Sequence, residues 1–221
     1  MSNINFDDTE FCDKIEQVIK FAKGRIPTSV WEMAVISGIH VSADEVRPIV
    51  LDESVWPDTD VTVYEYVRFL KSGWDLILNS LGSANTVVFM QTIMHSIVRN
   101  EDFGNLRTTE YRQAGLSYVP PMPDAYKIND DIMRLELIDN PALRAVACMC
   151  YIIRTAPFRC GNRRVALLIC NKILIENGVG ILSFRTKDNL DKFIKLMNEY
   201  YETDRPKELF SFVISDCIEQ I

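Results

Sequence analysis

RTAPFRCGNRRVALLICNKILIENG, residues 154–178, is the stretch that decides the fold of this chain. Pro157 lacks a backbone N–H and pushes the residue before it toward an extended conformation, so a helix ends here. Gly161 and Asn162 tolerate unusual backbone angles and let the chain reverse direction. Apolar residues at helical spacing follow from about Arg163, and the Asn-Gly pair that closes the stretch predicts where this helix stops. The stretch therefore predicts a turn that leads directly into a helix N-terminus.

The start of this helix combines the features that bind anions. Free backbone N–H groups and the positive end of the helix dipole favour negative charge at a helix N-terminus. A guanidinium group donates paired hydrogen bonds to phosphate oxygens, and three arginines lie close by in the sequence. They are Arg159, Arg163 and Arg164. We expect a phosphate site here; the alternative is a solvated helix start whose arginines form surface ion pairs.

The bulk properties of the chain indicate one globular domain. Its 221 residues suffice for one substantial core. The net charge of −7 argues against general binding to nucleic acids or anionic membranes, because those surfaces attract an excess of Lys and Arg. No apolar run approaches the roughly 20 residues of a membrane span, and no secretory signal is visible. We therefore expect a cytoplasmic protein with neither nucleic acid nor membrane among its partners.

The cysteines do not indicate a metal site. The chain has six of them, without paired CxxC motifs, and only two histidines. Because a zinc site needs four such ligands at suitable spacing, none is expected. Reduced and mostly buried thiols are the simpler interpretation.

Elsewhere the periodicity predicts helices separated by short turns. Pro27 predicts a turn between a first helix and a second, shorter one, and Ser42 with Glu45 predicts a capping box. The Gly and Pro residues within 100–123 exclude a long helix, so this segment is expected to form a short hairpin or an extended flap. The expected helices are residues 9–23, 31–36, 61–81, 85–99, 128–138, 141–154, 163–177, 188–202 and 206–219.

The motif APFRCGNRR, followed by an apolar helix, resembles the core motif of the Fic/Doc (Fido) family, HPFxxGNGRxxR, or HxFxxxNKR in its Doc-like branch. The resemblance continues in EYRQAGLSYVPPMP, NPALRAVACMCYIIR and GIHVSADEV, and covers about residues 30–200. It implies a mainly α Fic (Fido) fold, a helical core with a small β-hairpin flap beside the active site. It also implies transfer of a phosphate-containing group, most often AMP from ATP, to a hydroxyl of a target protein.

On this resemblance the whole chain, residues 1–221, is one Fic-like domain. N-terminal helices occupy residues up to about 58, the Fic core runs over about 60–203, and a C-terminal helix covers about 206–219. No composition shift or linker suggests a boundary between independent domains.

Two departures from the family pattern concern the chemistry. The family carries a histidine before Pro-Phe that takes the proton from the target hydroxyl; here Ala156 stands in its place, and a methyl group accepts no proton. The position of Cys160 commonly carries Asp or Glu, which binds Mg²⁺, whereas a thiol is a soft and poor magnesium ligand. The resemblance thus implies an inactivating substitution, a lineage that binds without catalysing, or chemistry carried by another residue.

The nucleotide-binding part of the motif is better retained. The resemblance implies that Arg164 grips a terminal phosphate and that Asn162 holds an α- or β-phosphate. Arg163 stands where AMP-transferring members carry Gly and Doc-like members usually carry Lys, and Leu167 replaces the second Arg, as in the Doc-like pattern. The expected nucleotide-binding residues are Arg159, Gly161, Asn162, Arg163 and Arg164.

The flap and the inhibitory element of the family have counterparts here. Leu116, Ser117 and Tyr118 resemble the flap that docks an extended target segment by strand pairing, although an ordinary proline-rich surface loop fits the same residues. Many members carry an inhibitory helix with the pattern [ST]xxxE[GN]. Its N-terminal form is not retained, because Ser37 stands at the Glu position. Glu219 fits a C-terminal SxxxE pattern and is a candidate inhibitory residue; the alternative is a plain terminal amphipathic helix.

The leading interpretation is a Fic-type transferase similar to protein adenylyltransferases, inactive as written because of Ala156. ATP is the expected substrate. A Mg²⁺ ion could accompany it, but Cys160 stands where the family has the Mg²⁺ ligand. The expected partners are ATP or a related nucleotide and an unknown target protein. Two alternatives stay open. One is a Doc-like phosphotransferase, and the other is a non-catalytic Fic-fold binding or regulatory protein.

Overall fold

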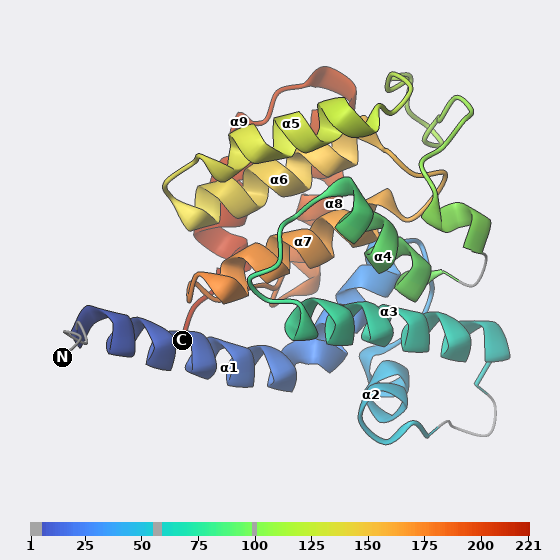
Figure 1. Ribbon diagram of the computed structural model, residues 1–221. Helices are drawn as coiled ribbons and strands as arrows, with labels where there is room; N and C mark the ends of the chain where they lie inside the picture. Colours follow the sequence, from blue (N-terminus) through green and yellow to red (C-terminus); the bar gives the residue numbers. More distant parts are fainter. Residues whose placement is uncertain (1–5, 55–58, 99–100) are drawn as a thin grey trace.

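The computed structural model describes residues 6–54, 59–98 and 101–221 and shows a mainly α-helical fold with one small antiparallel sheet (Figure 1). The helices are α1 Phe6–Ile36, α2 Ala43–Asp52, α3 Val61–Asn79, α4 Val87–Ile97, α5 Ala125–Glu136, α6 Pro141–Thr155, α7 Asn162–Glu176, α8 Lys187–Thr203 and α9 Lys207–Phe212. A 3₁₀ turn covers Glu101–Gly104 and a π-helix covers Val213–Cys217, while the strands are β1 Ile181–Leu182 and β2 Ile218–Glu219. Within the described ranges, no helix combines the length and the apolar character needed to cross a bilayer.

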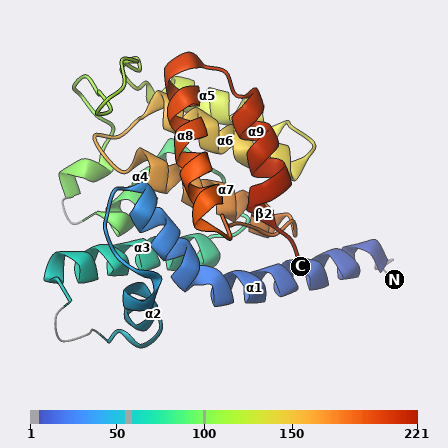
Figure 2. The same ribbon diagram turned by 180° about the vertical axis from the view of Figure 1, so that it is seen from behind.

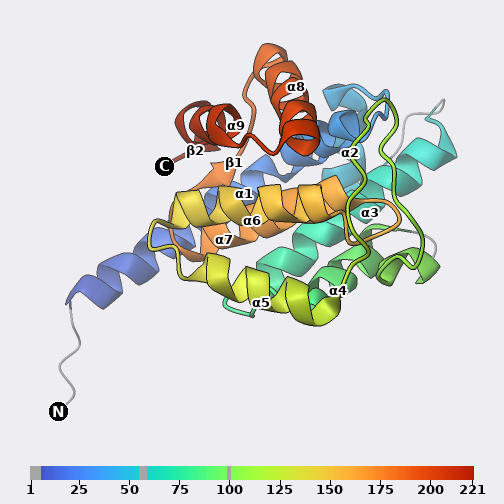
Figure 3. The same ribbon diagram turned by 90° about the horizontal axis from the view of Figure 1, so that it is seen from above.

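Helix α7 is the centre of the core. The run 165–175 within it is buried on every face, as expected for a helix that other helices surround. Helix α6 lies alongside α7, with α1 and α3 against another side (Figures 1 and 3). Helices α8 and α9 cover the face seen from behind in Figure 2.

Two buried polar residues of α7 find their partners in other elements. The Nζ of Lys172 donates to the Ser83 carbonyl at 2.6 Å and to Glu176 Oε2 at 2.7 Å. The Oδ1 of Asn171 accepts from the Leu182 N–H at 2.8 Å, which connects α7 to β1. Because an unpaired buried polar group is costly, these bonds make the central helix compatible with full burial.

The turn expected at Pro27 is wrong, because α1 runs without interruption through this residue. Proline in a helix interior removes one hydrogen bond and strains the preceding turn. However, Val18, Ala22, Ile26 and Val30 form one buried stripe across the proline at helical spacing. Burial of this continuous stripe outweighs the local cost. The capping box is confirmed: the Ser42 N–H donates to Glu45 Oε2 at 2.8 Å, and the Glu45 N–H donates to Ser42 Oγ at 3.2 Å.

The expected C-terminal helix 206–219 is only partly correct. Helix α9 ends at Phe212, the π-helix follows, and the last part forms strand β2, in which Glu219 pairs with Ile181. A side chain at Gly180 would place its Cβ 2.1 Å from the Glu219 carbonyl oxygen. The backbones can therefore approach this closely only because glycine stands there. The pairing with β1 overrides the helical pattern of the terminus.

The small sheet also lies elsewhere than expected. Residues 105–124 form an extended flap that turns back at Gly115, where φ is 78°, and the described residues of this segment form no strand ladder. A single bridge joins Leu106 to Phe158. Of the two forms expected for this segment, the extended flap is the one observed (Figure 3).

A buried carboxylate connects α1 to the segment after β1. Glu32 accepts a hydrogen bond from the Phe184 N–H at 2.8 Å and lies 3.4 Å from Ser183 Oγ. Burial raises the pKa of Glu32 to about 7, and these two hydrogen bonds and Arg25 only partly offset the effect. The nearby carboxylate of Glu219, which pairs with Arg25, also raises the pKa of Glu32.

The raised pKa of Glu32 predicts a pH-dependent stability. Between about pH 4.5 and 7 the folded chain holds a proton that the unfolded chain has released, so the stabilisation present at low pH is lost as the pH rises through 7. In urea titrations the free energy of unfolding should fall by up to about 1.4 kcal/mol per pH unit in this window. Glu32→Gln should remove this slope, whereas Glu16→Gln, at an exposed position of the same helix, should retain it. An unchanged slope in Glu32→Gln would contradict the assignment.

Candidate functional site

The turn between α6 and α7 holds two residues in the left-handed backbone region. Ala156, at the C-terminal end of α6, has φ 41° and donates its N–H to the Ile152 carbonyl at 3.0 Å. Gly161 has φ 73° and precedes α7, whose N-terminus receives no side-chain cap from the described residues. A Cβ at Gly161 would lie 2.9 Å from the sulfur of the flexible Met94 side chain, so the positive φ, more than the lack of space, favours glycine here. The N-terminus of α7 thus keeps its N–H groups free of side-chain acceptors.

Asn162 closes the turn. Its Oδ1 accepts from the Phe158 N–H at 2.8 Å, and its Nδ2 donates to the Phe158 carbonyl at 2.9 Å. The side chain is buried although the residue lines the cavity described next. Both ends of the amide therefore serve the conformation of the loop, and the phosphate contact expected for Asn162 stays a prediction.

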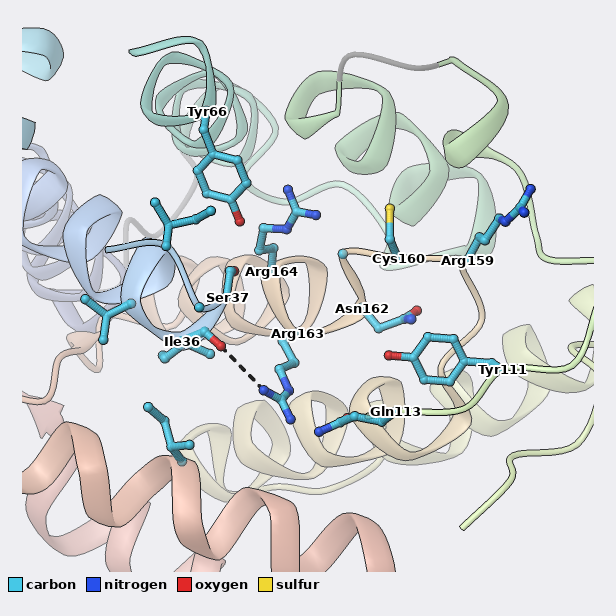
Figure 4. Close-up of a pocket in the computed structure, with 15 residues that line it drawn as sticks. Ile36, Ser37, Tyr66, Tyr111, Gln113, Arg159, Cys160, Asn162, Arg163 and Arg164 are labelled. Atoms are coloured by element: carbon cyan, nitrogen blue, oxygen red, sulfur yellow. Dashed lines mark hydrogen bonds between the residues drawn. The ribbon is translucent and has the colours of Figure 1, made fainter. Parts of the chain in front are cut away.

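A cavity of about 570 Å³ opens at the N-terminus of α7 (Figure 4). Its wall comes from the end of α1, from α3, from the flap, from α8 and from the turn itself. Three arginines and no carboxylate line it in the described part of the chain, although the protein carries a net charge of −7. The polar lining residues are Ser37, Tyr66, Tyr111, Gln113, Arg159, Cys160, Asn162, Arg163 and Arg164. The cavity is therefore a local positive site on an acidic protein.

Arg163 and Arg164 are held by neutral groups. Arg164 donates to the Ile97 carbonyl at 3.2 Å and lies 5.2 Å from the centre of the Tyr66 ring. Arg163 donates from Nη2 to Asn198 Oδ1 at 2.6 Å, and burial lowers its pKa. No carboxylate of the described ranges pairs with either arginine. Their positive charges are oriented without being neutralised.

The third arginine, Arg159, has a different orientation. It is exposed, and its guanidinium lies 5.8 Å from the centre of the Phe103 ring. Figure 4 shows its side chain directed away from Arg163 and Arg164, although the residue contributes to the cavity wall. The structure thus brings together two of the three arginines that the sequence singled out.

The two substituted motif positions differ in their access to the cavity. Ala156 is buried and does not belong to the cavity lining, while Cys160 does. Burial raises the pKa of the Cys160 thiol, and Arg164 and Arg159 oppose this effect. Because no carboxylate oxygen lines the cavity in the described residues, the side chains present do not fit a Mg²⁺ ion.

Arg107 is a structural residue of the site that the sequence did not reveal. It is buried, and its Nε donates to the Ala156 carbonyl at 2.8 Å. Its Nη2 donates to the Pro120 carbonyl at 3.2 Å and to the Pro121 carbonyl, and burial lowers its pKa. Arg107 therefore ties the end of the flap to the turn before α7. A lone arginine in an irregular segment carries no signal for this role.

Asn198, on α8, is the second residue that sequence reasoning missed. Its Oδ1 accepts from Arg163, as described above, and also from Gln113 Nε2 at 3.1 Å. One amide oxygen thus joins α7, α8 and the flap at the edge of the cavity.

The flap residues expected to dock a target are bonded within the chain. The Leu116 N–H donates to the Gln113 carbonyl at 3.1 Å. The N–H groups of Ser117 and Tyr118 donate to the carboxylate of Glu202 at 2.9 and 3.1 Å. Target docking by these residues stays a prediction, and strand pairing through their N–H groups would require these internal bonds to open.

The two positions compared with the family's inhibitory element differ in their relation to the cavity. Glu219 is part of β2 rather than of a helix, bonds to Arg25, and does not belong to the cavity lining. Ser37, just after α1, does line the cavity. The end of α1 thus lies against the candidate phosphate site. In the inhibitory pattern a glutamate would stand at position 37, whereas here Ser37 provides no carboxylate.

These features define a class: an α-helical domain with an arginine-lined cavity at the N-terminus of its central helix. Residues 85–174 match the Fic/DOC family model. Among solved structures, a segment of Fic-1 from C. elegans is similar with a TM-score of 0.70 and 17% identity, over 85% of this chain and 58% of that one. A Fic domain-containing signalling protein from Bacteroides thetaiotaomicron has a TM-score of 0.73 and 13% identity, over 93% and 89% of the two chains.

A point variant of the Fic-1 segment is similar as well, with a TM-score of 0.70 and 16% identity over 95% of this chain and 69% of that one. No curated protein matches the chain. The chain spans less than two thirds of the first Fic-1 segment. The structural likenesses establish a Fic-type fold, and the match over residues 85–174 shows that this part of the chain is similar to the Fic/DOC family.

The contacts of Arg107 predict that it stabilises the site. Arg107→Ala would leave the buried carbonyl groups of Ala156 and Pro120 without their donor, so we expect the free energy of unfolding to fall by about 2–4 kcal/mol. Urea unfolding measures this loss, and limited proteolysis should show faster cleavage within the flap. Arg112→Ala, on the exposed part of the same flap, is the matched control and should change stability by less than about 0.5 kcal/mol. Equal stabilities of the two variants would contradict the role.

Proposed function

We propose that this protein binds ATP or a related nucleotide, with the phosphates at the N-terminus of α7. The observation that carries the proposal is the cavity that Arg163 and Arg164 line together, with no carboxylate among its described lining residues, on a protein of net charge −7. A phosphate there would meet free N–H groups, the helix dipole and two guanidinium groups whose present partners are neutral.

In this proposal Arg164 and Arg163 hold the phosphates. Arg164 donates one hydrogen bond to a backbone carbonyl, lies over an aromatic ring and interacts with the Cys160 side chain, so its guanidinium, with five N–H donors, retains donors for a phosphate. Arg163 is fixed by Asn198, which orients its charge toward the cavity. Tyr111 and Gln113 of the flap, which line the same cavity, would contact the remainder of the nucleotide.

We further propose that the fold is that of a protein adenylyltransferase with an impaired catalytic step. In such a transfer the hydroxyl oxygen of a target attacks the α-phosphorus, pyrophosphate leaves, and a base must accept the hydroxyl proton. Ala156 offers no base. Cys160 does not replace it, because a thiol whose pKa burial has raised stays protonated at neutral pH. Binding is then retained while transfer is slow.

Two alternatives have specific support. A Doc-like phosphotransferase is favoured by Arg163 and Leu167, which follow that branch of the motif. A non-catalytic Fic-fold protein is favoured by the burial of Ala156 and by the absence of a carboxylate among the described cavity residues. Both share the nucleotide site with the leading proposal, so binding is tested first.

Calorimetric titration of ATP tests the site. The unaltered chain should bind ATP, and Arg164→Ala should weaken binding at least about tenfold, since a charge-assisted phosphate contact is lost. Arg159→Ala, which removes the guanidinium directed away from the other two, is the matched control and should change affinity little. Inorganic pyrophosphate should compete with ATP. Equal affinity in all three proteins, or no ATP binding by the unaltered chain, would contradict the proposal.

Restoring the base tests the chemistry. Ala156 has a positive φ, which histidine adopts more readily than most residues, so Ala156→His suits the backbone. We expect this variant to label itself or a lysate protein about 10²–10⁴ times faster than the unaltered chain. Label retained from the α-phosphate of ATP indicates AMP transfer, and label retained only from the γ-phosphate indicates phosphate transfer. If ATP binds and neither label is incorporated, the non-catalytic alternative holds.

A further inference from the structure

The flap is attached to the body of the protein mainly at its two ends. Arg107 and Pro120 are buried, whereas no residue of 108–119, which we name the flap tip, is buried. Figure 1 shows this part as a long loop at one edge of the molecule. Among the described residues, the backbone of the flap tip makes one hydrogen bond to itself, from the Leu116 N–H to the Gln113 carbonyl. A segment with so few buried contacts opens at a low cost in free energy.

One carboxylate holds the flap tip to α8. The N–H groups of Ser117 and Tyr118 donate to Glu202, as described above, and the Ser117 hydroxyl donates to the same carboxylate. The centre of the Tyr118 ring lies 3.9 Å from the guanidinium carbon of Arg154 and 5.1 Å from the centre of the Tyr201 ring. Because the bonds to Glu202 lie at the surface, water can replace them, and the contact can open and close.

The closed flap tip covers a hydroxyl group that lacks a partner. Tyr201 is 1% exposed, and its hydroxyl finds no hydrogen-bond partner among the described residues. Burial raises the pKa of Tyr201, and Tyr111 and Tyr118 of the flap tip, which lie nearby, act in the same direction. A buried hydroxyl without a partner costs free energy, which is recovered when water reaches it. Tyr201 therefore opposes the closed position that Glu202 stabilises.

The flap tip is also a wall of the arginine-lined cavity. Tyr111 and Gln113 line this cavity. Gln113 shares the Asn198 amide oxygen with Arg163. We propose that the flap tip is a movable wall of the cavity, held closed by a releasable latch at Glu202. When the latch opens, the tip turns away about its buried ends, Gln113 leaves Asn198, and the cavity widens.

Hydrogen exchange of the Leu116 amide tests the latch, because this N–H bonds within the flap tip and not to Glu202. In Glu202→Ala the exchange should become at least about fivefold faster, since the charge-assisted bonds that close the tip are lost. Glu199→Ala removes an exposed carboxylate from the same helix and is the matched control, with unchanged exchange. Neither position belongs to the core, so both variants should unfold at nearly the same urea concentration as the unaltered chain. Exchange that Glu202→Ala does not accelerate, or that Glu199→Ala accelerates equally, would overturn the latch.

Tyr201→Phe tests the opposing effect. It removes the unpartnered hydroxyl and keeps the ring that packs against Tyr118. Exchange of the Leu116 amide should therefore slow at least about threefold, opposite to the effect of Glu202→Ala. Exchange that stays the same or becomes faster would overturn the role assigned to this hydroxyl.

Addition of ATP tests the connection to the cavity, and this part of the experiment rests on the proposed function. ATP in the cavity would contact Tyr111 and Gln113 and should slow Leu116 exchange at least about threefold. Arg164→Ala should show no such protection at an ATP concentration that saturates only the unaltered chain. If calorimetry shows bound ATP and the exchange is unchanged, the movable wall is overturned. If ATP does not bind, the proposed function fails, while the Glu202 and Tyr201 variants still decide the latch.

Discussion

The burial of α7 on all sides is the constraint on which the rest of the structure depends. A helix that carries apolar residues on every face must be surrounded, and α1, α3, α4 and α6 together with β1 surround this one. Its buried Asn171 and Lys172 are then satisfied by groups that those neighbours bring. The positions of the other helices follow from the need to cover α7 and to pair its polar groups.

The candidate site is a consequence of how this central helix begins. The N-terminus of a buried helix must be satisfied or must open onto a cavity. Here Asn162 and Arg107 hold the preceding turn in place, and no side chain caps the helix. Its dipole and the charges of Arg163 and Arg164 therefore meet in one cavity. The same turn also buries Ala156, whose side chain does not belong to the cavity lining.

Sequence reasoning succeeded where local chemistry decides and was wrong where distant segments meet. The turn, the helix after it and the capping box at Ser42 follow from short-range rules. The turn predicted at Pro27 was wrong because a buried apolar stripe continues across this residue. The C-terminal helix was predicted too long because its last residues pair with β1 instead. Arg107 and Asn198 could not be found, since their partners lie on segments far along the chain.

By itself the sequence determined the mainly helical fold, the resemblance to the Fic/Doc family and the position of Ala156 where that pattern has histidine. These are properties of single residues and of periodicity, which need no knowledge of distant contacts. Only the tertiary structure decided that Arg163 and Arg164 share a cavity while Arg159 points away, and that Glu202 binds the flap N–H groups. The physical reason is that burial, charge neighbours and hydrogen-bond partners depend on which segments the core brings together.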